Sequence, residues 1–577
     1  MIKVLRPYLK GFEKYALLGV ICIVAEAVIE ILMPFLMGKI IDVGIANQDI
    51  GYVLKIGAFM LIMSLISLSF GVAAARFSAL AGMGFGSQVR KGLFHKIQEF
   101  SFSNIDKFST ASLVTRCTTD VNNLQTSFLM LNKMAFRAPV MLICATILAA
   151  KINMQLVWIF LIVIPILGFS LIFIIKKAFP KFEVMLTKYD NLNASVQENL
   201  VSIRVVKAFV RAVHEKTKFK LANDGLMQAS LKAEKIVIFN MPIMQLASYF
   251  CIITILWFGG NMVIGGTMLT GELVSFISYI TQILTSLLMI SMLFVNLLIS
   301  SASMERIVEV LNEKIDIVDG DETQTIGVQD GSIKFENVSF AYKKDSDEYV
   351  LKQINLEIAA GETIGILGGT GSSKSSLVQL IPRLYDTSKG HVYVGGKDVK
   401  EYSLKVLRDN VAMVLQKNTL FFGTIAENLR WGNEHASQAE LEEACKAACA
   451  HDFITSFPHG YETKLEQGGG NVSGGQKQRL CIARALIKKP KIIILDDSTS
   501  AVDTTTDANI RKAFRENLKD TTTIIIAQRI SSIQDADRII VLDEGQIQSI
   551  GTHEELLKHN AIYQEVYTSQ QKGVIHE

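Results

Sequence analysis

The first 305 residues consist mostly of long apolar runs separated by short polar links. The runs 236–271 and 273–304 contain no Asp, Glu, Lys or Arg, and neither do 56–75 and 154–175. About 20 predominantly apolar residues are enough to cross a bilayer as a helix. A shorter run, 138–150, requires a helix that begins further upstream. With the run near the N-terminus, the pattern predicts six membrane spans: 15–41, 52–81, 132–150, 154–176, 236–265 and 272–304.

Basic residues are concentrated in alternate connections between these spans. Lys and Arg crowd the N-terminus and the segments 76–137 and 176–235, whereas the short links near 42–51 and 265–272 are almost free of them. Under the positive-inside rule, this pattern predicts a multi-pass protein of the cell membrane with both termini in the cytoplasm. The basic segments contain few helix breakers, so we expect the membrane helices to continue into the cytoplasm as stalks.

Two acidic residues interrupt the first span. Glu26 and Glu30 lie one helical turn apart and therefore share a face near mid-membrane. A carboxylate that faces lipid is costly, so both are expected to face the bundle interior or an aqueous cavity. They either form a cation-attracting wall of a transport pathway or are neutralised by protonation or internal hydrogen bonds.

After residue 305 the apolar runs become shorter and glycine-punctuated strands appear. Residues 313–332 are polar and rich in Asp and Gly, which indicates a linker. We therefore predict a membrane all-α domain at 1–312, with six spans and long cytoplasmic stalks. A cytoplasmic α/β P-loop domain is predicted at 333–577.

The stretch 362–367 reads as a buried strand that runs into a glycine-rich turn and then a helix. That order is the context that a phosphate-binding P-loop requires. Backbone N–H groups would cradle the phosphates, Lys374 would reach the outer phosphates, and Ser375 would contact Mg²⁺. The predicted nucleotide-binding residues of the loop are Gly368, Thr370, Gly371, Ser372, Ser373, Lys374, Ser375 and Ser376.

A second apolar strand, 491–495, ends in Asp496 and Asp497. A strand that delivers a carboxylate is the usual magnesium-side partner of a P-loop. Between the two strands, the sequence Asn-Val-Ser-Gly-Gly-Gln at 471–476 opens a helix that carries Arg and Lys. The order and spacing of these elements predict a nucleotide-binding domain that uses ATP and Mg²⁺.

Composition sharpens this division of the chain. The 577 residues are 50% hydrophobic with a mean hydropathy of +0.32, which is unusual for a wholly soluble protein. The net charge of +3 excludes a strongly basic nucleic-acid binder. Residues 1–305 hold 27 Lys and Arg against 16 Asp and Glu, whereas the remainder holds 31 against 39. The small net charge is the sum of a basic membrane half and an acidic nucleotide-binding half.

Together these motifs make the chain resemble a half-transporter of the ATP-binding cassette (ABC) exporter family over nearly its whole length. Tyr342 resembles the aromatic residue that stacks on adenine, and Gln416 resembles the Q-loop glutamine that contacts Mg²⁺ along with Ser375 and Asp496. Asp503 resembles the D-loop aspartate, and Glu466 the acidic residue ahead of the signature. The signature motif itself is matched by Ser473, Gly474, Gly475 and Gln476. The stretch 202–209 resembles the one that leads to the second coupling helix.

Three positions depart from the family pattern. Hydrolysing members carry Glu where this chain has Asp497, a switch histidine where it has Gln528, and Gly where it has Ser373. Asp is one methylene shorter than Glu, and an amide cannot carry the charge or shuttle a proton as imidazole can. All three changes fall in the chain's own P-loop site, whereas the signature that would serve a partner is intact.

The resemblance implies two cassettes that sandwich two ATP molecules, each between the P-loop of one subunit and the signature of the other. The departures predict the degenerate-site subunit of a heterodimeric multidrug exporter, in which the partner is a second, non-identical half-transporter in the bilayer. Its substrates would be hydrophobic or amphipathic small molecules. The alternatives are a lipid or peptide exporter, a slow homodimer, and a subunit in which ATP gates transport without driving it.

Overall fold

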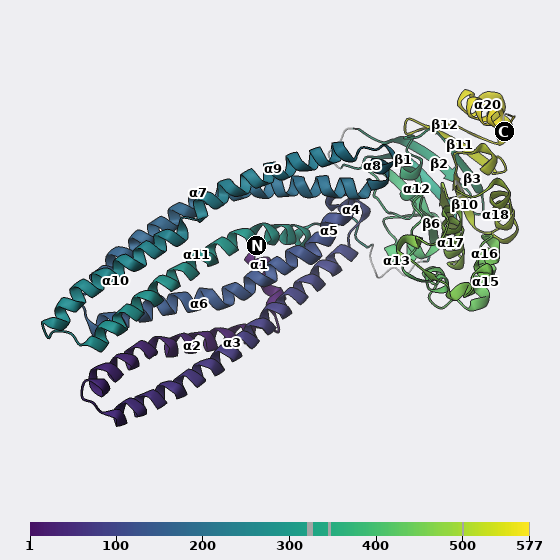
Figure 1. Ribbon diagram of the computed structural model, residues 1–577. Coiled ribbons are helices and arrows are strands. Elements are labelled where there is room, and N and C mark those ends of the chain that lie inside the picture. The colour runs from purple at the N-terminus through teal and green to yellow at the C-terminus, as the bar shows by residue number, and fades with distance from the viewer. Residues whose placement is uncertain (320–326, 344–347, 499–500, 576–577) are drawn as a thin grey trace. The chain divides into compact units, whose positions relative to one another are not determined.

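The computed structural model describes residues 1–319, 327–343, 348–498 and 501–575. It divides into two units, one formed by 1–98 and 110–313, and the other by 99–109 and 314–577 (Figure 1). The short segment 99–109 thus groups with the second half of the chain, although it lies between two long helices of the first.

Long helices make up nearly all of the first unit. Six of them are long and apolar enough to cross a membrane, as the hydropathy pattern predicts. The helix of the third span extends further upstream than residue 132, because α6 begins at Val121. The helices are α1 (Ile2–Leu5), α2 (Glu13–Lys39), α3 (Ile50–Gln98), α5 (Thr110–Thr115), α6 (Val121–Ile152), α7 (Trp158–Val201), α8 (Ile203–Ala208), α9 (Ala212–Val237), α10 (Asn240–Ile264) and α11 (Thr270–Asn312).

Helices α2, α6, α7, α10 and α11 share an apolar core. Tyr279 of α11 is fully buried there, and its hydroxyl donates to the carbonyl of Ile31 on α2 at 3.0 Å. Nearer the end of α2, Gly38 and Gly271 bring α2 and α11 close together. A Cβ on Gly271 would lie 2.2 Å from the Gly38 carbonyl oxygen, so glycine is required for this approach.

The second unit is built on two larger sheets of four and six strands, with a further two-stranded sheet formed by β7 and β8. The larger sheet has the order β12-β11-β3-β10-β9-β6, in which only β12 is antiparallel to its neighbour. The smaller has the order β2-β1-β4-β5 and is antiparallel. The strands are β1 (Ile333–Phe340), β2 (Leu351–Ile358), β3 (Thr363–Leu367), β4 (Lys389–Val394), β5 (Lys397–Asp398), β6 (Val411–Val414), β7 (Gly423–Thr424), β8 (Lys464–Leu465), β9 (Ile492–Asp496), β10 (Thr522–Ile526), β11 (Arg538–Asp543) and β12 (Gln546–Gly551).

Strands β3, β9 and β10 are buried almost throughout, and their sequences are continuous apolar runs. Such runs are typical of parallel strands covered on both faces. The second unit's helices are α4 (Phe102–Phe108), α12 (Lys374–Gln379), α13 (Leu404–Asn410), α14 (Ile425–Leu429), α15 (Gln438–Ala447), α16 (His451–Ser456), α17 (Gly474–Ile487), α18 (Thr504–Asn517), α19 (His553–His559) and α20 (Ala561–Ile575). The fold class is therefore a six-span helical region followed by an α/β domain.

Candidate functional site

The carboxyl ends of three neighbouring parallel strands bring the predicted phosphate-site residues to one edge of the larger sheet. β3 ends at Leu367 and leads into the P-loop, β9 ends at Asp496, and β10 ends at Ile526, two residues before Gln528. In the register, Ile526 pairs with both Ile366 and Asp496. Ligands of open α/β sheets bind outside this edge.

Backbone geometry in the P-loop depends on two glycines. A Cβ on Gly368 would lie 2.2 Å from the carbonyl oxygen of Leu542, so no larger residue fits where the loop leaves the sheet. Gly371 has a φ of +88°, a conformation that favours glycine. The loop residues Thr370 and Gly371 are exposed, as a surface that receives phosphates must be.

Lys374 begins helix α12 and folds back over its own loop. Its ammonium group donates to the carbonyl oxygens of Gly368 at 2.9 Å and Gly369 at 2.8 Å, and to the Ser372 hydroxyl at 3.3 Å. Burial lowers the pKa of Lys374, and the carboxylates of Asp496 and Asp497 partly oppose that shift. These donors could exchange the carbonyl oxygens for phosphate oxygens, which carry more negative charge.

Ser373 occupies a backbone conformation suited to glycine. Its φ and ψ are 71° and 25°, in the left-handed region, at the residue that precedes α12. A residue with a Cβ costs roughly 1–2 kcal/mol in that conformation. The departure from glycine at this position is therefore a strained one.

Ser373→Gly is expected to stabilise the second unit by about 1 kcal/mol, because it removes the Cβ from a left-handed residue. For a domain of 150–250 residues this is a rise of about 2–4 °C in Tm, measurable by thermal unfolding of the purified chain. Ser373→Ala is the matched control, since it loses the hydroxyl but keeps the Cβ. An equal rise in Tm for both variants would contradict the strain.

Three oxygen donors predicted to hold Mg²⁺ lie at adjoining positions. The Ser375 hydroxyl donates to Asp496 Oδ1 at 2.9 Å, and Gln416 hydrogen-bonds the neighbouring Asp497. Asp496 is buried, which raises its pKa, while the bond from Ser375 opposes the rise. Hydroxyl, carboxylate and amide oxygens suit a hard cation such as Mg²⁺, which would supply charge neutralisation for bound phosphates.

Asp497 and Gln528, at the positions where the resemblance leads us to expect Glu and His, contact each other. The amide of Gln528 donates to Asp497 Oδ2 at 2.8 Å. Burial raises the pKa of Asp497, and the hydrogen bonds from Gln528 and Gln416 oppose that rise. Asp497 also has a φ of +49°. Its carboxylate is thus held between two neutral amides, neither of which can take a proton from a water molecule at neutral pH.

The signature residues form the start of α17. The Ser473 hydroxyl accepts from the Gln476 amide N–H at 3.3 Å, while the Gln476 side chain accepts from the Ser473 N–H at 2.9 Å. This capping box leaves Ser473 and Gly474 exposed at a helix N-terminus, which is an arrangement that attracts anions. Asp503 caps α18 by accepting from the Thr506 N–H at 2.9 Å. Ser500, ahead of it in the D-loop motif, is outside the described residues.

Tyr342, the predicted adenine-stacking residue, is 47% exposed. Its hydroxyl lies 2.7 Å from the Ser376 hydroxyl of α12, which ties the ring to the helix that follows the P-loop. Sequence reasoning missed its neighbour Tyr385, whose ring centre lies 5.3 Å from that of Tyr342 at an angle of 88°. Tyr385 belongs to no sequence motif, because its contact with Tyr342 depends on how distant segments pack.

In the membrane half, Glu26 and Glu30 are both ion-paired with Arg137 of α6. Arg137 donates to Glu26 Oε1 at 2.9 Å and to Glu30 Oε2 at 2.5 Å. Arg137 lies inside the predicted third span, 132–150, and also at the end of the basic segment 76–137, and the structure pairs it with two carboxylates of the first span. One guanidinium against two carboxylates leaves one negative charge. The signal that could have identified Arg137 is its place immediately before the apolar run 138–150.

Arg137→Ala is expected to destabilise the membrane half, because it leaves two carboxylates unpaired within a span. The expected result is a Tm lower by roughly 5 °C or more for the purified protein. The variant Glu26→Gln, Glu30→Gln, Arg137→Met removes all three charges and should recover most of the loss. A Tm of Arg137→Ala equal to that of the wild type would contradict the role of the ion pairs.

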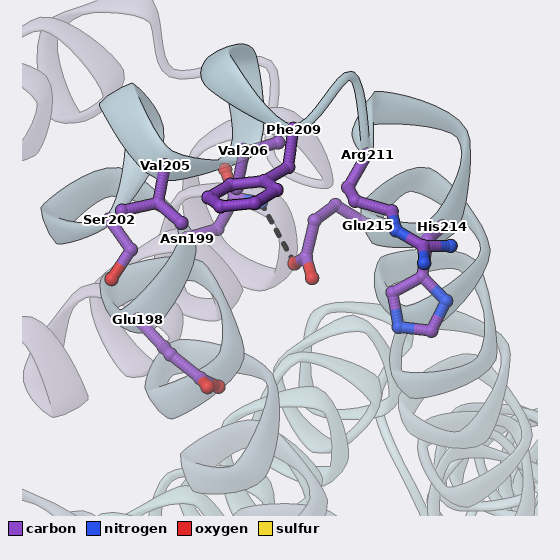
Figure 2. Close-up of a pocket in the computed structure, with 9 residues that line it drawn as sticks. All are labelled: Glu198, Asn199, Ser202, Val205, Val206, Phe209, Arg211, His214 and Glu215. Carbon is purple, nitrogen blue, oxygen red and sulfur yellow. Dashed lines mark hydrogen bonds between the residues drawn. The ribbon is translucent and has the colours of Figure 1, made fainter.

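Helix α8 and the turns beside it connect α7 to α9, and we call this region the α8 tip (residues 198–215). It encloses a cavity of about 500 Å³, lined by the residues that Figure 2 labels. Asn199 donates to Glu215 at 2.9 Å and so ties the end of α7 to the start of α9 within the tip. Phe209 and Val210 are 73% and 85% exposed. Exposed apolar side chains in such a group mark an interaction surface.

A second exposed apolar group follows Gln416. The rings of Phe421 and Trp431 stack with centres 4.0 Å apart, and Phe422 follows Phe421 in sequence. All three are exposed. We call this group the aromatic patch; sequence reasoning missed it because its members lie outside any motif.

Known protein families match both units. Residues 16–287 match the ABC transporter transmembrane region and residues 351–500 the ABC transporter domain. The chain is 39% identical to the uncharacterized ABC transporter ATP-binding protein YfiB of Bacillus subtilis, over 98% of this chain and 97% of that one. It is 31% identical to the ATP-dependent lipid A-core flippase of Syntrophus aciditrophicus, over 99% and 94%.

A solved structure shows the same architecture. A bacterial Atm1-family ABC exporter with ATP bound superposes with a TM-score of 0.82 at 25% identity, over 99% of both chains. The family match, the six apolar helices and the P-loop edge of the sheet agree. The chain belongs to the ABC transporter family, as a half-transporter of the exporter type with one membrane region and one ATP-binding domain.

Proposed function

We propose that this chain is the degenerate-site subunit of a heterodimeric, ATP-driven exporter of hydrophobic or amphipathic compounds. ATP and Mg²⁺ bind at its own P-loop but are hydrolysed there slowly. The hydrolysis that drives transport takes place at the P-loop of a second, non-identical half-transporter, completed by Ser473 and Gly474 of this chain.

The contact between Asp497 and Gln528 carries this proposal. The two residues lie 2.8 Å apart at the edge of the sheet where phosphates would bind. A carboxylate one methylene short of Glu, held by amides instead of an imidazole, is poorly placed to activate water. A misplacement of ~1 Å can cost about 10²-fold in rate. Lys374, Ser375 and Asp496 remain, and they support nucleotide binding without fast hydrolysis.

The exposed surfaces support assembly with a partner. The α8 tip presents Phe209 and Val210 outside the membrane spans, and the aromatic patch presents Phe422 and Trp431. In this assembly the α8 tip of each subunit docks on the other subunit's patch near the Q-loop glutamine. Because each tip docks on the other subunit, closure of the two ATP-binding domains would move the membrane helices of both subunits. Both termini lie in the cytoplasm.

The membrane half supports an amphipathic substrate. Glu26, Glu30 and Arg137 place a net negative charge within the spans, and Glu30 is the most exposed of the three. This favours compounds that carry a cationic group. A lipid substrate is the second candidate, supported by the similarity to a relative named as a lipid A-core flippase. Accumulation of each class in inside-out vesicles, with ATP and with a non-hydrolysable analogue, separates these candidates from an ATP-gated subunit.

The assembly is tested by the ATPase rate of this chain purified alone and with its partner. The expected result is a rate for the pair that exceeds that of the isolated chain by about 10²-fold, the cost of a misplaced catalytic group. Equal rates per cassette would overturn the degenerate site and leave a homodimer.

A further inference from the structure

We propose that Tyr385 is a positioning residue that links nucleotide occupancy at Tyr342 to helix α4, through its hydrogen bond to Asp106. We call Tyr342, Tyr385 and Asp106 the tyrosine relay. The relay lies wholly within the second unit, which includes residues 99–109. It rests on the proposed function only in that ATP occupies the P-loop.

On the nucleotide side, the relay begins at the exposed face of Tyr342. The hydroxyl of this ring also contacts Ser376, which is next to the proposed Mg²⁺ ligand Ser375. The edge-to-face contact with Tyr385, at 5.3 Å and 88°, is a favoured aromatic geometry. Adenine stacking on Tyr342 would therefore restrict the motion of a ring that is in contact with Tyr385.

At the other end of the relay, Tyr385 contacts α4 directly. Its hydroxyl donates to Asp106 Oδ2 at 2.7 Å, and its ring meets Phe102 edge-on at 5.9 Å. Tyr385 is only 8% exposed. Burial, followed by the Asp106 carboxylate, raises the pKa of Tyr385, so the phenol remains a donor at neutral pH.

Helix α4 is also anchored to the segment that follows α11. The Asn104 amide donates to the Lys314 carbonyl at 3.0 Å, and the Ser103 hydroxyl donates to Asp316 at 2.7 Å. In sequence, α4 lies between α3 and α5, and α5 leads toward the long helix α6. A shift of Tyr385 thus acts on a short helix that lies between two candidate membrane spans in sequence and is bonded to the segment that follows α11.

A purely structural role predicts a different outcome from a relay. If Tyr385 only fills space, Tyr385→Phe retains the packing, and the effect of ATP on α4 is the same as in the wild type. If the hydrogen bond transmits occupancy, Tyr385→Phe and Asp106→Ala lose the same signal and the double variant loses no more. Asp106→Asn keeps a carbonyl oxygen that can accept from the phenol, so it should behave like the wild type.

Amide hydrogen exchange of α4 tests the relay without requiring a transported substrate or turnover. The full transporter in nanodiscs is compared with and without ATP in EDTA, which permits binding but not hydrolysis. ATP is expected to slow exchange of residues 102–108 in the wild type and in Asp106→Asn. The ATP-dependent slowing should fall by roughly fivefold in Tyr385→Phe and in Asp106→Ala, at the lower end of typical couplings between sites.

Tyr402→Phe is the matched control, because Tyr402 is also buried but donates to the Val394 carbonyl instead of to α4. ATP affinity, measured in parallel with a fluorescent nucleotide, confirms that each variant still binds. An ATP effect on α4 that is the same in Tyr385→Phe as in the wild type would overturn the relay. So would loss of the effect in Asp106→Asn to the same degree as in Asp106→Ala.

Discussion

Asp497→Glu combined with Gln528→His is expected to raise the ATPase rate of this chain, purified without a partner, by about 10²-fold. The longer carboxylate reaches further toward the attacking water, and the imidazole replaces the amide that now donates to residue 497 at 2.8 Å. The rate is measured as phosphate release by the chain in nanodiscs at saturating ATP and Mg²⁺.

The matched control keeps the new side-chain length but has no carboxylate. Asp497→Gln with Gln528→His adds the same methylene but no carboxylate, so it should stay at the wild-type rate. Both variants place a longer side chain at a residue with φ of +49°, so backbone strain affects them equally. A rate for the Glu and His variant that equals that of this control would contradict the account.

Gly474→Asp is expected to lower the ATPase rate of the assembled transporter by about 10²–10³-fold, comparable to the loss of one donor that stabilises a transition state. Gly474 is the first residue of α17, and the exposed N–H groups there would face the phosphates bound at the partner's P-loop. A carboxylate at this place repels those phosphates. The measurement is phosphate release by the purified pair.

Loss of folding would not explain that result, because an acidic residue in the first turn stabilises a helix. Gly474→Ala is the control. Among the residues that the structure describes, a Cβ at residue 474 would meet only the Ala501 side chain, at 3.6 Å, which is ordinary contact, so this variant should keep most of the turnover. Equal activity of Gly474→Asp and the wild type would show that the signature of this chain completes no active site.

The local structure of the site could be predicted from the sequence, because it depends on consecutive residues. A strand, a glycine-rich turn and a helix carry Lys374 and Ser375, and a buried strand ends at Asp496, as the sequence indicates. Phosphate binding at these residues stays a prediction. The apolar runs likewise predicted six spans, since the length needed to cross a bilayer is fixed by physics. The strain at Ser373 follows from a backbone angle that only the structure provides.

Contacts between distant segments could not be predicted in this way. Tyr385 and Asp106 are 279 residues apart, and Arg137 is 111 residues from Glu26. Nothing in either local sequence specifies the other partner. Charge counting grouped Arg137 with the basic segment 76–137, although the predicted span 132–150 includes it, because the positive-inside rule does not recognise a basic residue that pairs inside a span.

The most direct test of the central claim identifies which P-loop holds trapped product. The assembled pair is incubated with a radiolabelled, photoreactive ATP analogue, Mg²⁺ and vanadate, then irradiated, and its two chains are separated. The account predicts that trapped nucleotide labels the partner chain, with little label on this chain. Label mainly on this chain, or equal label on both, would contradict it.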